Sequence, residues 1–429
     1  NWQAPFGITL AVDLFGAVIG ALSSLVGLLV VVYSQAVVPE EPQRFGFYPL
    51  LFILFMGVNG AFTTGDLFNL YVWFEVLLMA SFVLMALGNT RAQLEGSLKY
   101  VILNLVASMI FLTATGLTYA LTGTLNMADL AQRLPQVAQS GLVYVLGALF
   151  LAAFGIKAAV FPFFFWLPAS YHTPPVVVTA LFSGLLSKVG VFALVRLFTL
   201  LLNPLLPQFR ALLLAIAAVT MLTGVLGAAA QWDTRRLLAF HIISQIGYLL
   251  MGLGIGSPLS LAALVFFMVH VVLAKLALFL VAGMVDRAAG GFDLHRLGGL
   301  YRQNGWLSLV FALPALALAG LPPFSGFIAK LALVRAGLEA GQWLVVGVSL
   351  LVSLLTLFSM SKIWQEAFWK PAPSGARFQR VSGWMWLPVA VLAALVLALG
   401  LAAQPLFDLS LASASQMIDP SGYIQAVLE

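Results

Sequence analysis

Residues 258–284 read PLSLAALVFFMVHVVLAKLALFLVAGM, an apolar run that carries two ionisable residues, His270 and Lys275. About 20 apolar residues are enough for a helix to cross the ~30 Å hydrocarbon core of a bilayer. Backbone amides inside lipid must find hydrogen-bond partners within their own segment, and barrel strands would be about half this length. The stretch therefore predicts a transmembrane α-helix.

Similar runs recur along the whole chain, and we count twelve of them. They fall at 6–34, 47–64, 66–88, 97–121, 141–168, 174–201, 209–230, 235–254, 258–284, 307–336, 342–369 and 383–404. The sequence thus predicts an all-α, polytopic membrane protein with about 12 transmembrane helices.

The composition agrees with this class of protein, because 62% of the 429 residues are hydrophobic and only 8% are charged. The absence of cysteine excludes disulfides, thiolate zinc sites and cysteine-ligated iron–sulfur clusters. No loop holds five or more consecutive Lys or Arg, so the net charge of +5 does not indicate nucleic-acid binding. We expect no cofactor and no metal ion. The chain starts at Asn1 without a basic signal segment, and we expect the natural sequence to begin upstream.

The basic residues predict the orientation of the chain, because short cytoplasmic loops carry the positive excess. The loops after the first, third, fifth, seventh, ninth and eleventh predicted helices hold twelve Lys and Arg. The alternate loops and adjoining helix ends hold four, which are Arg133, Arg196, Arg210 and Arg335. We therefore expect a cell-membrane protein with its N-terminus outside.

Four lysines remain, and all of them lie inside predicted membrane segments: Lys157, Lys188, Lys275 and Lys330. A charge at the bilayer centre costs from about 3 to more than 10 kcal/mol, so each needs a partner, water or a neutral state. Glu75 lies nine residues beyond Asp66, roughly 13 Å along its helix, and its partner is expected to be Lys157 or Lys188. A fixed structural Glu–Lys pair is the alternative to a functional one.

Two histidines also lie in membrane segments. His270 and Lys275 are five residues apart, about 140° around the helix axis, so they face different neighbours and can bridge two adjacent water pockets. His241 lies shallower on the cytoplasmic side and suits proton exchange, although an intramembrane histidine can equally serve a helix–helix hydrogen bond. Lys275 can also snorkel toward a helix end. For His172, in the loop SYHTPP, a structural role is favoured.

Two predicted helices are interrupted beside their lysines. One reads FGIKAAVFPFFFWLP, with Pro162 five residues after Lys157. The other reads LAGLPPFSGFIAK, with Pro322 and Pro323 before Lys330. Proline removes an amide donor and breaks a helix, and open backbone at this depth needs a protein or water environment. Each break therefore predicts buried water beside a lysine.

The interrupted helices also indicate an internal repeat. Predicted helices two to six and seven to eleven form two blocks of five, each with a broken fourth member, and an odd block length inverts the second block. We therefore expect an amino-terminal helix and loop at 1–45, a first repeat at 46–202, a second inverted repeat at 203–370, and a carboxy-terminal helix and tail at 371–429. This pairing relates Lys157 to Lys330 and places Glu75 and His241 on corresponding helices.

Three stretches resemble a known family: FMGVNGAFTTGDLFNLYVWFEVLLMASFVL (55–84), KAAVFPFFFWLPASYHTPPVVVTALFSGLLSKVGVFALVR (157–196) and ALAGLPPFSGFIAK (317–330). They resemble the antiporter-like subunits shared by Mrp-type multisubunit Na⁺/H⁺ antiporters and respiratory complex I. The phrase GDLFNLYVWFE is most similar to the D subunits of the Mrp antiporters. The resemblance covers nearly the whole chain and implies a fourteen-helix fold, of which two amino-terminal helices are missing here.

The resemblance also implies functional residues. The family's functional glutamate falls on Glu75, its broken-helix lysine on Lys157, the lysine of the next helix on Lys188, and the later ionisable residue on Lys330. Relatives often carry a histidine four residues before the lysine of the 258–284 segment, where this chain has Val271, preceded by His270.

These observations together predict a proton-translocating subunit of a Na⁺/H⁺ antiporter complex, with Glu75, Lys157, Lys188, His241, His270, Lys275 and Lys330 as the path. The expected partners are other hydrophobic subunits of the same complex, H⁺, Na⁺ and the lipid bilayer, with no nucleic acid. The alternatives are a proton-pumping subunit of a complex I-like oxidoreductase or membrane-bound hydrogenase, and a purely structural membrane scaffold.

Overall fold

The computed structural model describes residues 2–137 and 141–429, and within these ranges the regular structure is helical. The first helices are α1 (Leu14–Ser34), α2 (Glu40–Arg44), α3 (Phe47–Thr63), α4 (Leu67–Ala86), α5 (Arg91–Thr122), α6 (Met127–Arg133), α7 (Gly141–Ala158), α8 (Trp166–Ser170), α9 (Val176–Leu181) and α10 (Ser187–Arg196). The later helices are α11 (Leu206–Ala230), α12 (Thr234–Ile255), α13 (Pro258–Ala289), α14 (Leu300–Gln303), α15 (Gly305–Ala319), α16 (Ser325–Glu339), α17 (Trp343–Ile363), α18 (Gly383–Leu401), α19 (Gln404–Ile418) and α20 (Ser421–Leu428).

The predicted all-α membrane fold is confirmed. Within the described residues, ten helical segments are long and apolar enough to cross a membrane, and two further apolar helices, α3 and α15, are shorter. Twelve spans therefore stay a prediction, which requires that α3 and α15 also cross the membrane.

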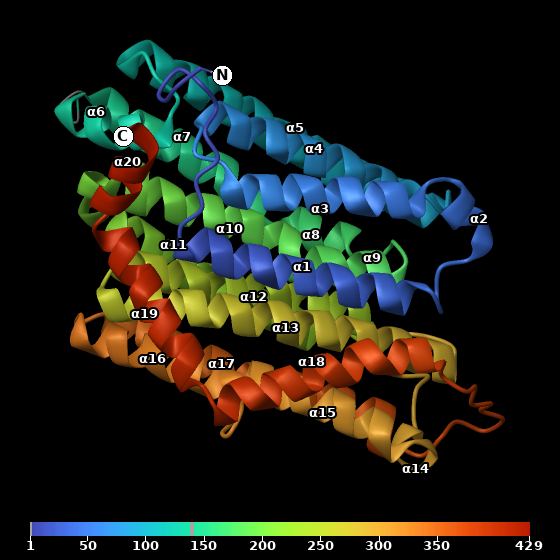
Figure 1. The fold of residues 1–429 in the computed structure, drawn as a ribbon. Helices are drawn as coiled ribbons and strands as arrows, with labels where there is room; N and C mark the ends of the chain where they lie inside the picture. Colours follow the sequence, from blue (N-terminus) through green and yellow to red (C-terminus); the bar gives the residue numbers. More distant parts are fainter. Residues whose placement is uncertain (1, 138–140) are drawn as a thin grey trace.

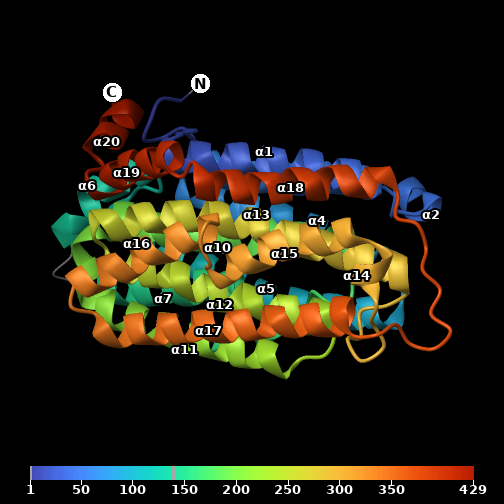
Figure 2. The ribbon, with the colours of Figure 1, turned by 90° about the horizontal axis from the view of Figure 1, so that it is seen from below.

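The helices form one bundle in which most axes run roughly side by side (Figures 1 and 2). Both chain ends lie at one end of the bundle together with α6 and α20, whereas α2 and α14 lie at the other end (Figure 1). The helix α13 runs through the interior, and its membrane-length window is completely buried. Large apolar side chains on α5 and α17 are exposed, as expected for helices that face lipid.

The sequence defines both ends of α13. Ser257 caps its first turn by a reciprocal pair of hydrogen bonds with Ser260, and Pro258 occupies the first turn, where no amide donor is needed. Gly290 ends the helix in the left-handed conformation (φ +81°) and donates to the Asp286 carbonyl. These local signals fix the position of the buried helix that carries His270 and Lys275.

Both broken helices end in the same way. The last residue of α7 is followed by Ala159 at φ +60°, and the last residue of α15 is followed by Gly320 at φ +90°. A left-handed residue just past a helix closes its last turn, and here the amides of Val160 and Leu321 donate to carbonyls five residues earlier. Pro162 follows the first ending, and Pro322 and Pro323 follow the second.

Two helices in corresponding places of the chain also begin alike. Asp66 caps α4 and Asp233 caps α12, each by accepting a backbone amide hydrogen bond three residues on. Each aspartate also pairs with a loop residue, Asp66 with Asn126 and Asp233 with Asp293, at the same separation of 60 residues (66 to 126 and 233 to 293). The first loop leads to α6 and the second to α14, at opposite ends of the bundle (Figure 1).

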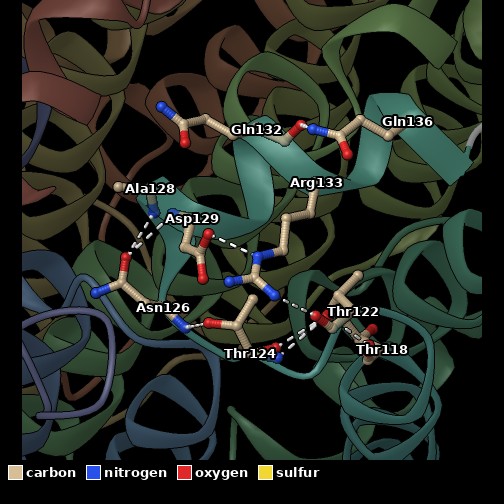
Figure 3. A network of polar contacts seen from close by, with 9 residues as sticks. All are labelled: Thr118, Thr122, Thr124, Asn126, Ala128, Asp129, Gln132, Arg133 and Gln136. Atoms are coloured by element: carbon tan, nitrogen blue, oxygen red, sulfur yellow. Dashed lines mark hydrogen bonds and ion pairs between the residues drawn. The ribbon is translucent and has the colours of Figure 1, made fainter.

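A polar network fastens the end of α5 to α6, as Figure 3 shows. Arg133 donates from Nε to Asp129 (2.8 Å) and from Nη1 to the Thr122 carbonyl (2.9 Å). Asn126 accepts from the first amides of α6 and pairs with Asp66 at the start of α4. The network therefore fixes α4 relative to α5, the two helices that carry Glu75 and Ser108.

An ion pair ties α1 to the bundle. Arg196, the last residue of α10, donates from both terminal nitrogens to the two carboxylate oxygens of Asp13, the N-cap of α1, at 2.6 Å each. Both side chains are only 9% exposed. Such a bidentate geometry defines the relative position of two helices more precisely than a single contact.

Candidate functional site

The first group of intramembrane polar residues joins α4, α5 and α7. Lys157 donates from Nζ to the Ser108 hydroxyl (3.0 Å), and Ser108 donates to the Glu75 carboxylate. The Lys157 ammonium also lies over the Phe74 ring, 4.8 Å from its centroid. Glu75 is half-buried, whereas Ser108 and Lys157 are buried. The expected Glu–Lys partnership is therefore present through a bridging hydroxyl.

Sequence reasoning missed Ser108. The pattern that could have identified it is a polar stripe along α5, formed at helical spacing by the buried residues Asn104, Ser108, Thr115 and Thr118. Such a stripe in an otherwise apolar helix indicates the face that meets other polar groups.

A small cavity of about 10 Å³ lies beside Lys157, where the break of α7 predicts buried water. Its lining includes Asn104, Tyr171 and Leu186. Tyr171 is fully buried, and within the described residues its hydroxyl has no hydrogen-bond partner. A cavity of this size holds about one water molecule when polar groups line it.

Lys188 lies on α10 and is fully buried. Its Nζ donates to the Ser183 carbonyl (2.5 Å), which belongs to the π-helical segment η3 (Phe182–Leu186). Short π-helical segments are frequent at functional sites. Gly190 brings this helix against the end of α7, because a Cβ there would lie 2.7 Å from the Ala158 amide nitrogen. The helices of Lys157 and Lys188 are therefore in direct contact.

The two ionisable residues of α13 face different neighbours, in agreement with their helical spacing. Lys275 donates from Nζ to the Leu238 carbonyl of α12 (3.1 Å). His270 forms a hydrogen bond between Nδ1 and the Ser325 hydroxyl (2.8 Å), at the first residue of α16. Both are fully buried. Lys275 therefore stays inside the protein and does not reach a helix end.

Lys330 reaches back to the helix break. Its Nζ donates to the carbonyls of Leu318 (2.9 Å) and Ala319 (3.1 Å), the last two residues of α15, and lies 4.9 Å from the centroid of the Tyr248 ring. Carbonyls at a helix end have no partner within the helix and carry a partial negative charge. The open carbonyl end of α15 thus stabilises the positive charge of Lys330.

Lys157 and Lys330 do not occupy equivalent positions in their broken helices. Lys157 lies in α7, before the break, whereas Lys330 lies in α16, after the break. The two helices are broken in the same way, but their lysines lie on opposite sides of the break.

His241 completes the predicted path, and His172 is the histidine for which a structural role was expected. His241 is fully buried on α12, and neither ring nitrogen has a hydrogen-bond partner in the described part of the chain. His172 lies outside the path, where it bonds through Nδ1 to the Pro168 carbonyl (2.9 Å). Burial lowers the pKa of His172 below its usual value, and the nearby Arg236 lowers it further.

The arrangement suits proton transfer better than metal binding. The described residues contain no group of three or more His, Cys, Asp or Glu side chains that could hold a metal ion. Three of the four buried lysines donate to backbone carbonyls, and Lys157 reaches a carboxylate through a hydroxyl. Burial disfavours a charged amine, so each of these groups can exchange a proton with a neighbour or with water.

Known proteins are similar to this chain in sequence and in fold. The family model described as NADH:quinone oxidoreductase/Mrp antiporter, TM matches residues 64–356. The D subunit of the Na(+)/H(+) antiporter of Alkalihalophilus pseudofirmus is 46% identical over 432 residues, which covers 100% of this chain and 87% of that protein. The corresponding D subunit of Bacillus subtilis is 39% identical, with 100% and 87% covered. A chain in the structure of the Mrp complex from Dietzia sp. DQ12-45-1b has a TM-score of 0.92 and 34% identity, and the match covers 100% of this chain and 88% of that one.

Proposed function

The chain belongs to the family described as NADH:quinone oxidoreductase/Mrp antiporter, TM, and we propose that it is the proton-translocating subunit of a Na⁺/H⁺ antiporter complex. The names of the relatives support a transporter subunit rather than an enzyme. The solved relative is part of a multisubunit complex, so the partners of this chain are other membrane subunits.

The contact of Glu75 with Lys157 through Ser108 carries the proposal. Burial of a carboxylate and an ammonium among apolar helices costs folding free energy, which favours a functional reason for keeping both. Protonation of either group changes the field at its neighbours. A unit charge about 4 Å away at an effective dielectric constant of about 20 is worth roughly 4 kcal/mol.

The path runs along the plane of the membrane from Glu75 to Lys330. It passes Lys157 and Lys188, whose helices touch at Gly190, and then His270 and Lys275 on α13. His241 on α12 belongs to the same series. A proton that leaves one lysine makes it easier for the next lysine to accept one, because two nearby ammonium groups repel each other.

Two inverted repeats frame this path, at 46–202 and 203–370, between the segments 1–45 and 371–429. The matching aspartate caps of α4 and α12 and the matching ends of α7 and α15 support this division. Inversion gives one half-channel toward each side of the membrane. We place the chain in the cell membrane, and the loop charges favour an orientation with the N-terminus outside.

The half-buried Glu75 favours a contact with a partner subunit at this position, because a carboxylate that faces lipid is costly. The proposal assigns H⁺ to this chain. Na⁺ is exchanged by the complex as a whole.

The rival function is a proton pump driven by redox chemistry. The family description includes NADH:quinone oxidoreductase, but the relatives at 46% and 39% identity carry the antiporter name. Purification separates the two functions, because an antiporter complex contains only membrane subunits, whereas a redox pump brings electron-transfer subunits with it.

Reconstitution of the whole complex in vesicles tests the proposal. A Na⁺ gradient alone should drive proton flux in the opposite direction, without an electron donor. Lys157→Ala should abolish the flux while the complex still assembles, and Lys99→Ala, at an exposed pair with Glu95, should not change it. Flux that requires an electron donor, or full flux in Lys157→Ala, would overturn the proposal.

A further inference from the structure

A groove of about 290 Å³ lies between α15 and the last part of α17, which continues into the π-helical segment η6 (Trp364–Trp369). The two helices pack against each other and run side by side in Figure 2. One wall of the groove includes Phe311, Ala312 and Leu316, and the other includes Leu357, Met360 and Trp364. We call this feature the α15–α17 groove.

The shape and the lining of the α15–α17 groove suit a hydrocarbon chain. Leu357, Met360 and Trp364 follow the spacing of one helix face, so the groove follows the helix axis for about 10 Å. The segment that contains α17 is long and apolar enough to cross a membrane, and a groove along it is parallel to the lipid chains. The lining is apolar except for the Ser361 hydroxyl and two indole nitrogens. An open apolar groove of this kind marks a ligand or interaction site.

Aromatic rings surround one end of the groove. The Trp364 ring lies 6.4 Å from the ring of Tyr301 in α14 and 6.1 Å from that of Trp369, between centroids. Tyr301, Trp306 and Trp369 are 53% to 71% exposed. Tyr and Trp gather where a membrane meets water. This end of the groove therefore lies at the bilayer surface, and the loop charges predict that it is the cytoplasmic surface.

The same end carries an excess of positive charge. The segments 291–303 and 364–383 meet there, since the Gly299 amide donates to the Lys370 carbonyl. Together they hold five basic and two acidic residues, which are Arg296, Arg302, Lys370, Arg377 and Arg380 against Asp293 and Glu366. Arg302 is exposed and directly follows Tyr301 in α14. An arginine at this place can donate hydrogen bonds to a phosphate at the end of the groove.

We propose that the α15–α17 groove binds an anionic phospholipid, with one acyl chain in the groove and the phosphate at Arg302. Basic pockets between transmembrane helices on the cytoplasmic side bind anionic head groups in this way. A helix of a partner subunit is about 10–12 Å across, so it would cover the groove rather than fill it. The inference goes beyond the proposed function and does not depend on it.

The proposed lipid lies against the half-helix that stabilises Lys330. Leu316, in the wall of the groove, is two residues before Leu318, whose carbonyl accepts from the Lys330 ammonium (2.9 Å). An acyl chain packed against this part of α15 supports the helix end that holds the lysine. The binding site is therefore structural support for the second half of the bundle.

Photolabelling of the whole complex in vesicles tests the site. The vesicles consist of phosphatidylcholine with a small fraction of phosphatidylglycerol that carries a diazirine in its acyl chain. After irradiation, mass spectrometry should find the label on peptides that contain residues 311–316 and 357–364. Phosphatidylcholine with the same diazirine should label these peptides about fivefold less, the effect of one basic residue at an anionic membrane surface.

Two variants address the two parts of the site. Ala312→Trp fills the groove and should abolish the label, whereas Leu354→Trp, at a 66% exposed position of α17 outside the lining, should retain it. Arg302→Gln should reduce labelling by phosphatidylglycerol about fivefold. Arg91→Gln, at the exposed start of α5, is its matched control and should have no effect.

Three results would overturn the proposal. Equal labelling by the two lipids would mean that the groove makes only non-selective contact with the bilayer. An assembled complex without label in the groove would mean that a partner subunit covers it. Undiminished labelling in Arg302→Gln would remove the phosphate contact, and this exposed substitution is informative even if Ala312→Trp fails to assemble.

Discussion

The two halves of the path stabilise the charges of their buried lysines in different ways. In the first half, Lys157 reaches the Glu75 carboxylate through Ser108, so a titratable side chain is its counterpart. In the second half, Lys330 donates to the Leu318 and Ala319 carbonyls at the end of α15, which cannot be protonated. The charge state of Lys157 is therefore coupled to a second proton site, whereas Lys330 experiences a fixed dipole.

This difference shows how one broken-helix design can serve two tasks. A lysine before the break, as in α7, leaves its head group free to meet a neighbouring helix, here α5. A lysine after the break, as in α16, can turn back to the open carbonyls of the preceding half-helix. The first half is suited to switching, and the second half is suited to holding and releasing one proton.

The largest effect on this comparison is expected from Lys330→Met. Methionine fills a similar space and removes the ammonium that the α15 carbonyls stabilise. Na⁺-driven proton flux in vesicles should fall roughly 100-fold or more, the range for removing a proton-transfer group. Arg335→Met, five residues on in the same helix and exposed in a pair with Glu339, is the control and should retain flux. Equal flux in both variants would remove Lys330 from the path.

An intermediate effect is expected from Ser108→Ala, which leaves Glu75 and Lys157 in place and removes their bridge. Flux should fall about tenfold, because a hydrogen bond to a charged group is lost. Ser108→Thr keeps the hydroxyl and should recover most of the flux. Thr113→Ala, at an exposed site on α5, serves as the control. An unaffected Ser108→Ala complex would mean that the two charged groups do not act through the serine.

The smallest effect is expected from Ser325→Ala, which removes the partner of His270 Nδ1 at the start of α16. The lysine contacts of the second half do not involve this serine, so flux should fall only about two- to threefold, as for one modest hydrogen bond. Ser359→Ala, a buried serine of α17 that bonds to its own helix, is the comparison. A loss as large as that of Lys330→Met would place His270 on the path as firmly as the lysines.

The membrane class and the positions of the helix breaks could be predicted from the sequence, because apolar length and proline act locally. That the four lysines lie within apolar helices could be predicted in the same way, and all four are buried. The partners could not be predicted. Ser108 and the carbonyls of Ser183, Leu238 and Leu318 are set by how separate helices pack, and any serine or carbonyl in the segment would have fitted the sequence pattern equally well.

The pairing of Lys157 with Lys330 shows a different limit. Helix order related the two broken helices, but the prolines already place Lys157 before its break and Lys330 after its break. The full burial of Ser244 and Gln245 on α12 could not be predicted either, because both look like ordinary polar residues in a membrane helix.

The central claim is that protons pass through the Glu75 end of this chain, and Na⁺-driven proton flux in vesicles that contain the complex with Glu75→Gln tests it most directly. Glutamine keeps the shape and an acceptor for Ser108 but cannot take up a proton. The account predicts assembled complex with no flux above that of empty vesicles, while Glu95→Gln, at the exposed pair with Lys99, retains normal flux. Flux in Glu75→Gln equal to that of the unsubstituted complex would contradict it.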